Sequence, residues 1–285
     1  MSNSTERRTI AQLLTHATQQ LDTTSARLDA EVLLAHALDK PRSHLHAWPD
    51  KVPAPDQQSR FAALLKRRIS GEPVAYLTGQ REFWSLALTV SRDTLIPRPE
   101  TETLVAQALS VIARDSRIDI ADLGTGSGAI ALAIARERPR ARILATDRSE
   151  SALSIARANG QQLGIGNVEF VAGDWCDALG ERQFDLLLSN PPYIAAQDRH
   201  LAEGDVRFEP RSALASGSDG MSALSTIASC ARQHLRAGGW LMLEHGYDQQ
   251  AAVMRLLKSL GYRDIADYPD DAGLSRVICG IWHQP

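Results

Sequence analysis

The sequence predicts an α/β protein in which a mostly parallel, doubly wound β-sheet follows a small bundle of helices. Residues 1–80 contain only two of the 19 glycines, Gly71 and Gly79. Beyond residue 118 the hydrophobic pattern alternates between strands and helices, which is typical of a parallel sheet covered on both faces. A length of 285 residues also favours two domains.

We expect residues 1–80 to form a helical domain with three main helices. The first has an apolar face with helical spacing, made of Ile10, Leu13, Leu14, Ala17 and Leu21. The second is expected over residues 25–38, with Leu28, Leu34 and Leu38 facing inward. The third should begin with Asp56 as its N-cap and end before Gly71. Its expected inward residues are Phe61, Leu64, Leu65 and Ile69. The basic residues Lys66, Arg67 and Arg68 form either a solvated helix face or a contact for an acidic partner.

Residues 81–95 are expected to be a linker hairpin, and residues 96–285 the sheet domain. Strands are predicted over residues 118–123, 141–146, 168–171, 184–189 and 240–244. Helices are predicted over residues 129–138, 150–163, 223–235 and 249–260. The last two strand-like runs, 262–268 and 275–282, leave no room for a helix between them. They should therefore pair as an antiparallel hairpin.

Composition and charge exclude several classes of protein. The formal net charge of −3 argues against a duplex nucleic-acid binder with a broad cationic surface, although it leaves a local basic groove open. The longest wholly apolar run, residues 129–135, is too short for a membrane helix. No apolar segment with a cleavage site follows the N-terminus, so we expect no secretory signal. Cys176, Cys230 and Cys279 are widely spaced, which predicts a cytoplasmic protein without a disulfide framework or a zinc site.

Polar and glycine-rich motifs follow the first three predicted strands of the sheet domain. After the first strand come Gly124, Thr125, Gly126, Ser127 and Gly128. Glycines at alternate positions let the backbone approach a ligand closely, but a tight strand–helix turn would also explain them. Asp147 ends the second strand, where it could accept from both hydroxyls of a ribose or act as a helix N-cap. Asp174 and Trp175 follow the third strand and could contact an adenine ring. Together these sites describe a pocket for an adenosine-bearing ligand.

The fourth predicted strand ends in Asn190-Pro191-Pro192-Tyr193. Neither proline has an N–H group, so this turn offers the Asn190 side-chain oxygen and the Pro191 carbonyl as acceptors. Two fixed acceptors suit a planar NH2 group, and Tyr193 could stack on the flat group that carries it. An ordinary Pro-Pro turn is the alternative. No metal is required, and no metal-ligand cluster is evident.

These motifs, with further segments upstream, resemble the bacterial release factor glutamine N5-methyltransferase (PrmC/HemK) family. The upstream segments are SARLDAE at residues 25–31, GEPVAYLTG at 71–79, Phe83-Trp84, and IPRPETE at 96–102. The resemblance covers nearly the whole chain. It implies a Rossmann-like class I methyltransferase sheet with a C-terminal antiparallel hairpin, preceded by a small N-terminal helical domain that docks the substrate.

The resemblance also implies the activity. The family uses S-adenosyl-L-methionine to methylate the glutamine amide of the Gly-Gly-Gln motif in class I peptide chain release factors. Residues Gly124 to Gly128 would line the methionine part of the cofactor, Asp147 would hold the ribose, and Trp175 would flank the adenine. Asn190, Pro191 and Tyr193 would clamp the amide. The Arg98–Glu102 segment would lie near the pocket, or would simply be a helix start with acidic residues in its first turn.

Two other functions remain open from the sequence. An adenine-N6 methyltransferase acting on nucleic acid would use the same clamp, but it would need a basic groove and a target-recognition region. A non-catalytic S-adenosylmethionine-binding protein would not need an intact Asn-Pro-Pro-Tyr motif. Neither direct nucleic-acid binding nor membrane binding is expected.

Overall fold

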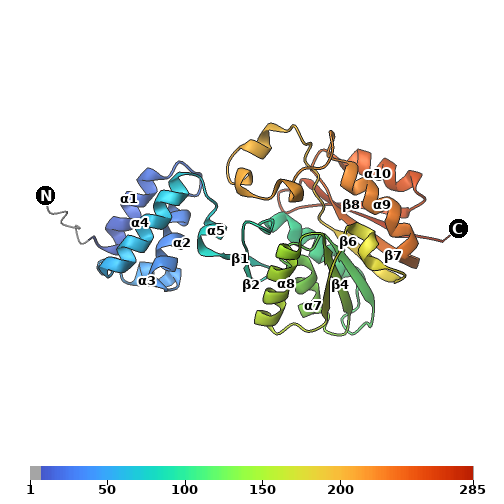
Figure 1. Ribbon diagram of the computed structural model, residues 1–285, viewed down its shortest axis with the longest axis horizontal. Helices are drawn as coiled ribbons and strands as arrows, with labels where there is room; N and C mark the ends of the chain where they lie inside the picture. The colour runs from blue at the N-terminus through green and yellow to red at the C-terminus, as the bar shows by residue number, and fades with distance from the viewer. Residues whose placement is uncertain (1–7, 285) are drawn as a thin grey trace. The chain divides into compact units, whose positions relative to one another are not determined.

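The computed structural model describes residues 8–284 of the chain. The chain divides into two compact units, with the boundary between Gly79 and Gln80 (Figure 1). Residues 1–7, which are part of the segment expected to carry no secretory signal, lie outside the described residues. Within residues 8–284, no helix is both long and apolar enough to cross a membrane.

The first unit is helical, as predicted, and has a single apolar core. Its helices are α1 (Ile10–Gln20), α2 (Ala26–Leu38), α3 (Arg42–Ala47), α4 (Pro55–Ile69) and α5 (Val74–Thr78). All five predicted inward residues of α1 are buried. Thr9 begins this helix with a capping box, because its hydroxyl accepts from the Gln12 backbone and the Gln12 side chain accepts from Thr9 N–H.

Three details of the predicted helical domain are wrong. Leu28 is 45% exposed, and Leu33 is buried in α2. Ile69 at the end of α4 is 50% exposed. The N-cap of α4 is Ala54, because the helix begins at Pro55 and places Asp56 in its first turn. Proline is favoured at the first helical position, where its missing N–H has no partner to lose.

A buried ion pair involves the segment at residues 25–31. Arg68 is only 7% exposed and donates from Nε to Asp29 at 2.9 Å. Asp29 also accepts from the Ser25 hydroxyl at 2.8 Å. The neighbouring Arg67 pairs with Glu72 at 2.7 Å. Of the three basic residues, Lys66 and Arg67 lie on the predicted solvated face, although Arg67 is paired with Glu72, and only Arg68 is buried.

The second unit is built on a seven-stranded sheet with the order β5-β4-β3-β6-β7-β9-β8. Its strands are β3 (Asp119–Leu123), β4 (Arg142–Asp147), β5 (Val168–Ala172), β6 (Phe184–Ser189), β7 (Leu235–Glu244), β8 (Arg263–Pro269) and β9 (Ser275–Trp282). Neighbours from β5 to β7 are parallel, whereas β9 runs antiparallel to both β7 and β8. This confirms the predicted parallel sheet and its C-terminal antiparallel hairpin.

Helices cover both faces of the sheet (Figure 1). They are α6 (Glu102–Val111), α7 (Ala129–Glu137), α8 (Glu150–Leu163), α9 (Ser222–His234) and α10 (Gln250–Ser259). Successive residues of β3 point to opposite faces, so Ile120 joins a core with α6 and α7, while Ala121 joins a core with α9 and α10. A hairpin of β1 (Gln80–Phe83) and β2 (Leu86–Thr89) begins this unit and overlaps part of the segment 81–95.

The cysteine prediction is wrong in one respect. Cys176 and Cys230 form a disulfide, with their Cα atoms 6.1 Å apart. Cys176 lies in the short 3-10 helix η2 (Trp175–Leu179), which packs against α9, where Cys230 lies. The two residues are 54 positions apart, so spacing alone gave no sign of the pair. Cys279 is free and buried.

Candidate active site

The glycine-rich loop leaves β3 and enters α7. Gly124, Gly126 and Gly128 all have positive φ, at 75°, 56° and 84°. A side chain at Gly124 would meet the Trp175 ring at 3.3 Å, so glycine is required for the loop to pass this close to the indole. At Gly126 a Cβ would meet nothing within 4 Å, which leaves open space beside the backbone.

The buried carboxyl group of Asp122 is hydrogen-bonded to this loop. Asp122 is fully buried, and its Oδ2 accepts a hydrogen bond of 2.6 Å from the Thr125 hydroxyl. Burial, with a smaller contribution from the charge of Asp147, raises the pKa of Asp122 to about 7. Its Oδ1 has no hydrogen-bond partner among residues 8–284. Thr125 thus points into the protein and orients the loop.

Asp147 connects the glycine-rich loop to the start of α8. Its Oδ2 accepts from the Gly126 backbone and its Oδ1 from the Ser149 backbone, both at 2.9 Å. The N-cap of α8 is Ser149, whose hydroxyl accepts from the Ala152 backbone. The alternative role of Asp147 as the N-cap is therefore wrong. Each carboxylate oxygen retains further acceptor capacity, because an ionised carboxylate has about four lone-pair sites.

The Asn190-Pro191-Pro192-Tyr193 turn is held by residues from two other parts of the chain. The Asn190 Nδ2 atom donates to the hydroxyl of Thr101 at 3.1 Å. The Tyr193 hydroxyl donates to Oε1 of Glu244 at 3.2 Å, and Gln249 donates to the Tyr193 carbonyl at 2.9 Å. Because the Asn190 amide donates to Thr101, its Oδ1 faces away and is available as an acceptor.

The Arg98–Glu102 segment is bonded to three other parts of the chain around the site. It forms a 3-10 helix, η1 (Pro99–Thr101), which continues into α6, so the predicted Pro-initiated helix start is present. Arg98 forms an ion pair with Glu209, which also accepts from the Ile96 backbone at 3.0 Å. Glu102 accepts from the Trp84 backbone at 2.8 Å. The segment therefore joins the hairpin, the Asn190 turn and the loop around residue 209.

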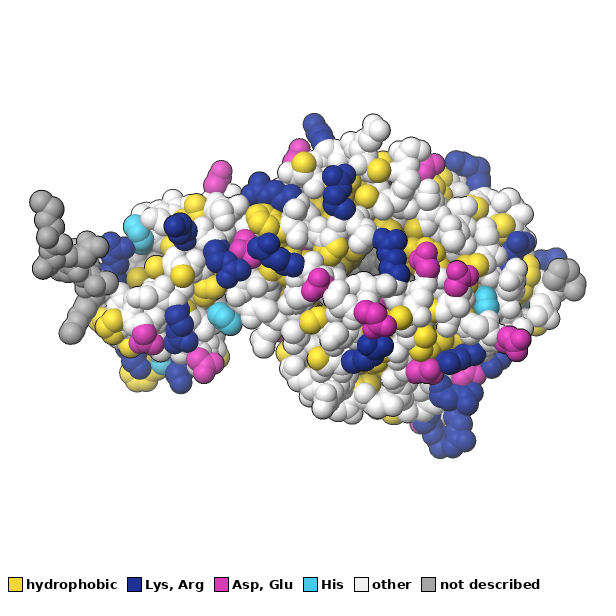
Figure 2. All heavy atoms as spheres, viewed as in Figure 1, with side chains coloured by type: hydrophobic (Ala, Val, Ile, Leu, Met, Phe, Trp, Pro, Cys, Tyr) yellow, Lys and Arg dark blue, Asp and Glu magenta, His cyan; other side chains and the backbone are white. Residues whose placement is uncertain are grey.

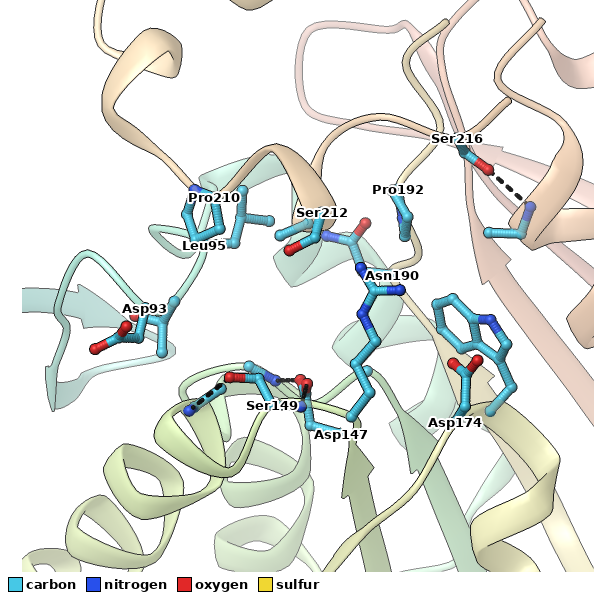
Figure 3. A pocket seen from close by; sticks show the side chains of 18 of the residues that line it. Asp93, Leu95, Asp147, Ser149, Asp174, Asn190, Pro192, Pro210, Ser212 and Ser216 are labelled. Atoms are coloured by element: carbon cyan, nitrogen blue, oxygen red, sulfur yellow. Dashed lines mark hydrogen bonds between the residues drawn. The ribbon is translucent and has the colours of Figure 1, made fainter. Parts of the chain in front are cut away.

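A cavity of about 460 Å³ opens at the carboxyl ends of β4, β5 and β6 (Figure 3). The predicted site residues that line it are Gly124, Gly126, Asp147, Asp174, Trp175, Asn190 and Pro192. The other predicted residues, Thr125, Ser127, Gly128, Pro191 and Tyr193, are not among its lining residues. Asp174 lies on the side opposite Asp93 and Leu95, with Asn190 between them (Figure 3).

Sequence reasoning missed part of this cavity. Its wall also includes residues 92–95, Arg148, Pro210, Ser212 and Ser216. The position of Arg148 directly after Asp147 could have indicated it. Nothing in the local sequence around the other residues indicates that they line a cavity. The segments around residues 95 and 210 are brought together by Glu209, which pairs with Arg98 and accepts from the Ile96 backbone.

Metal ligands are not grouped in the part of the chain that the structure describes. Residues 8–284 contain no cluster of three or more His, Cys, Asp or Glu side chains that could hold an ion.

Comparison with known proteins gives consistent relatives. Residues 12–79 match the family described as PrmC N-terminal domain, and residues 101–208 match the methyltransferase small domain. The release factor glutamine methyltransferase of Coxiella burnetii is 50% identical over 262 residues, which cover 91% of this chain and 94% of that protein. The protein of the same name from Xylella fastidiosa (strain Temecula1) is 52% identical over 268 residues, which cover 94% and 96%.

A solved structure supports the fold. The crystal structure of a methyltransferase from Pyrococcus furiosus is 17% identical and superposes with a TM-score of 0.54, covering 78% of this chain and all of that one. At this identity the likeness concerns the fold alone. With the matched families, it confirms the predicted Rossmann-like methyltransferase sheet.

Proposed function

The chain belongs to the release factor glutamine methyltransferase family, and from this premise we propose that it methylates the side-chain amide nitrogen of a glutamine. The glutamine is that of the Gly-Gly-Gln motif in class I peptide chain release factors, and S-adenosyl-L-methionine is the methyl donor. The observation that carries the proposal is the orientation of Asn190. Its amide donates to Thr101, at the rim of a cavity that also contains Asp147 and Trp175.

The residues present fit S-adenosylmethionine. Gly126 has open space beside its backbone, and the Trp175 ring lies against Gly124 where an adenine edge would enter. Asp147, held by two backbone N–H groups, can still accept from both ribose hydroxyls. Asp174 lines the same cavity and would accept from the adenine amino group. When bound, the cofactor would supply a methyl group on its sulfonium sulfur, and the neutral thioether left after transfer is a good leaving group.

The chain's own residues would act on the acceptor amide. An amide nitrogen is a poor nucleophile because its lone pair is delocalised. The Asn190 Oδ1 and the Pro191 carbonyl would accept from its two N–H groups, which polarises the nitrogen and stabilises positive charge as the new bond forms. Fixing the planar group in this way also sets the angle of attack. The proton can leave after transfer, so no strong general base is needed before it.

The first unit is proposed to dock the release factor. It lies outside the part of the chain that contains every cofactor motif, and it matches a family domain of its own. Because Arg67 and Arg68 are already paired within the unit, its contact with the substrate should not depend on a continuous basic patch.

Charge distribution favours a protein substrate over nucleic acid. On the face seen in Figure 2, Lys and Arg side chains are interspersed with Asp and Glu. Arg142 and Arg236, for example, both pair with Asp119 at 2.7 Å. A nucleic-acid groove would instead leave such cations available for phosphates.

The test is to incubate the full chain with S-adenosylmethionine labelled in its methyl group, together with a purified class I release factor or with DNA. We expect label on the Gly-Gly-Gln glutamine, located by peptide mass spectrometry. Label on DNA adenine would support the alternative methyltransferase, and the absence of label on either would contradict the proposed activity.

A further inference from the structure

One wall of the cavity is formed by the 210–216 segment, which precedes α9 and includes the 3-10 helix η5 (Arg211–Ala213). The residues of this segment that line the cavity are Pro210, Ser212, Ala213, Ala215 and Ser216. Pro210, Ser212 and Ser216 lie across the cavity from Asp147 and Ser149 (Figure 3). A cofactor held by Asp147 would therefore be covered by this segment.

Backbone hydrogen bonds hold the end of the segment that is nearest α9. The Ile194 N–H donates to the Leu214 carbonyl at 3.0 Å, and the Ile194 carbonyl accepts from the Ser216 N–H at 2.8 Å. The Ser216 hydroxyl accepts from the Ala223 backbone at 2.8 Å. Because Ile194 directly follows Tyr193, this end of the segment is attached to the proposed amide clamp.

The other end of the segment is attached by the side chain of Glu209. Its Oε2 accepts from the Ile96 N–H at 3.0 Å, and its Oε1 forms the ion pair with Arg98. The Glu209 side chain is fully buried, whereas that of Arg98 is 31% exposed. Ile96 lies 113 residues earlier in the chain. Glu209 thus joins the 210–216 segment to the segment whose residues 92–95 line the same cavity.

The 210–216 segment has little regular structure of its own. Its only helix is the single 3-10 turn η5, and both Arg211 and Ser212 are exposed. Short 3-10 turns have poor hydrogen-bond geometry and contribute little stability. How often such a segment opens is therefore determined mainly by the attachments at its two ends.

We propose that Glu209 is a positioning residue for the cofactor. Through Ile96 and Arg98 it holds the 210–216 segment over bound S-adenosylmethionine and slows the dissociation of the cofactor. The inference rests on the proposed function, which supplies the identity of the cofactor. Glu209 does not line the cavity, so it acts through Pro210 and Ser212, which do.

The test is Glu209→Gln in the full chain. Glutamine keeps the shape, and its Oε1 can still accept from Ile96, but its NH2 group cannot accept from the Arg98 guanidinium. We expect the dissociation rate of S-adenosylhomocysteine, the demethylated product, to rise about tenfold in stopped-flow measurements while its association rate stays unchanged. The KM for S-adenosylmethionine should rise, whereas kcat at saturating cofactor should stay near that of the wild type.

The matched control is Glu203→Gln, which removes an exposed glutamate from the same part of the chain. It should leave the dissociation rate at the wild-type value. An unchanged dissociation rate in Glu209→Gln would overturn the inference, and so would an equal increase in Glu203→Gln.

A double variant tests whether Glu209 acts through Arg98. Arg98→Met breaks the same ion pair from its other side and should also speed dissociation. Because residues that act as a pair have non-additive effects, Arg98→Met/Glu209→Gln should be no faster than the faster single variant. Effects that multiply in the double variant would show that the two residues act independently, and this would overturn the proposal.

Limited proteolysis separates positioning of the segment from a general effect on stability. In the free protein, trypsin should cleave after Arg211 faster in Glu209→Gln than in the wild type, because the segment opens more often. Cleavage after Arg142, on β4, should not change, and neither should the urea midpoint. Faster dissociation without faster cleavage after Arg211 would overturn the proposal. Faster cleavage at both sites with a lower urea midpoint would also overturn it.

The dissociation experiment distinguishes failure of this inference from failure of the proposed function. Equal dissociation rates in the wild type and Glu209→Gln overturn the inference even if the wild type methylates the release factor. A wild type that binds S-adenosylhomocysteine but methylates no release factor would contradict the proposed function and leave the effect of Glu209 measurable. A wild type that does not bind S-adenosylhomocysteine would overturn both.

Discussion

The Nδ2 atom of Asn190 donates a hydrogen bond of 3.1 Å to the hydroxyl of Thr101, which lies 89 residues earlier in the chain. Asn190 follows β6, and Thr101 ends the 3-10 helix before α6. This contact gives the Arg98–Glu102 segment a function within the site. In the proposed clamp, this contact fixes which end of the Asn190 amide faces the cavity, and so it would determine what the turn can recognise.

Asn190→Ala and Asn190→Asp should both lower kcat strongly. Alanine has no acceptor, and ionised aspartate cannot donate to Thr101 as the Asn190 amide does. We expect a decrease of about 10²–10³ for alanine, and aspartate nearly as poor. Single-turnover methyl transfer at saturating cofactor and release factor measures both. Near-wild-type turnover in Asn190→Ala would exclude the amide clamp, and an active Asn190→Asp would show that donation to Thr101 is unimportant.

Thr101 offers a matched pair of variants for the same contact. Thr101→Ser keeps the hydroxyl and should retain most of the activity. Thr101→Val keeps the shape but leaves the Asn190 amide without its acceptor, so kcat should fall as for Asn190→Asp. Equal activity of the two variants in the single-turnover assay would contradict the assigned orientation.

Asp147→Ala should weaken S-adenosylmethionine binding. Hydrogen bonds to a charged acceptor contribute about 1.5–3 kcal/mol each, and alanine also leaves the Gly126 and Ser149 backbone groups without their acceptor. Calorimetric titration with the cofactor measures the loss. Glu169→Gln is the control for removing an unrelated acidic group. Unchanged affinity in Asp147→Ala would remove this residue from the ribose site.

Removal of residues 1–79 should spare cofactor binding and reduce kcat/KM for the intact release factor. The boundary lies between Gly79 and Gln80, and every proposed cofactor contact lies beyond it. A short Gly-Gly-Gln peptide is the control substrate, since both forms of the enzyme should methylate it equally. Circular dichroism must first establish that the shortened chain folds. Equal kcat/KM of both forms on the intact protein would contradict the docking role.

The Cys176–Cys230 disulfide should stabilise the oxidised protein. It joins residues 54 positions apart, for which restriction of the unfolded chain contributes about 4 kcal/mol. Cys230→Ser should therefore lower the urea midpoint under oxidising conditions. With excess dithiothreitol, wild type and variant should unfold at similar urea concentrations. A midpoint of wild type that does not respond to the reductant would mean that the bond does not stabilise the fold.

Hydrophobic periodicity predicted the sheet and most of the helices, because alternation and helical spacing are local properties of the chain. Ile10, Leu13 and Leu14 are buried as their spacing required, and the C-terminal hairpin pairs as predicted. Leu28 and Ile69 show the limit of this reasoning. Each has an apolar side chain on a correctly predicted helix, but whether it is covered depends on where the neighbouring helices pack.

The sequence alone determined the motifs and the edge of the sheet at which they meet. Gly124, Asp147, Trp175 and Asn190 all line one cavity because the carboxyl ends of parallel strands share an edge. Only the tertiary structure decided which distant groups complete that edge. Thr101 meets Asn190, Glu209 meets Arg98, and Cys176 meets Cys230 through the packing of separate elements. Such partners are chosen by chain packing over long sequence separations, and no local spacing in the sequence encodes them.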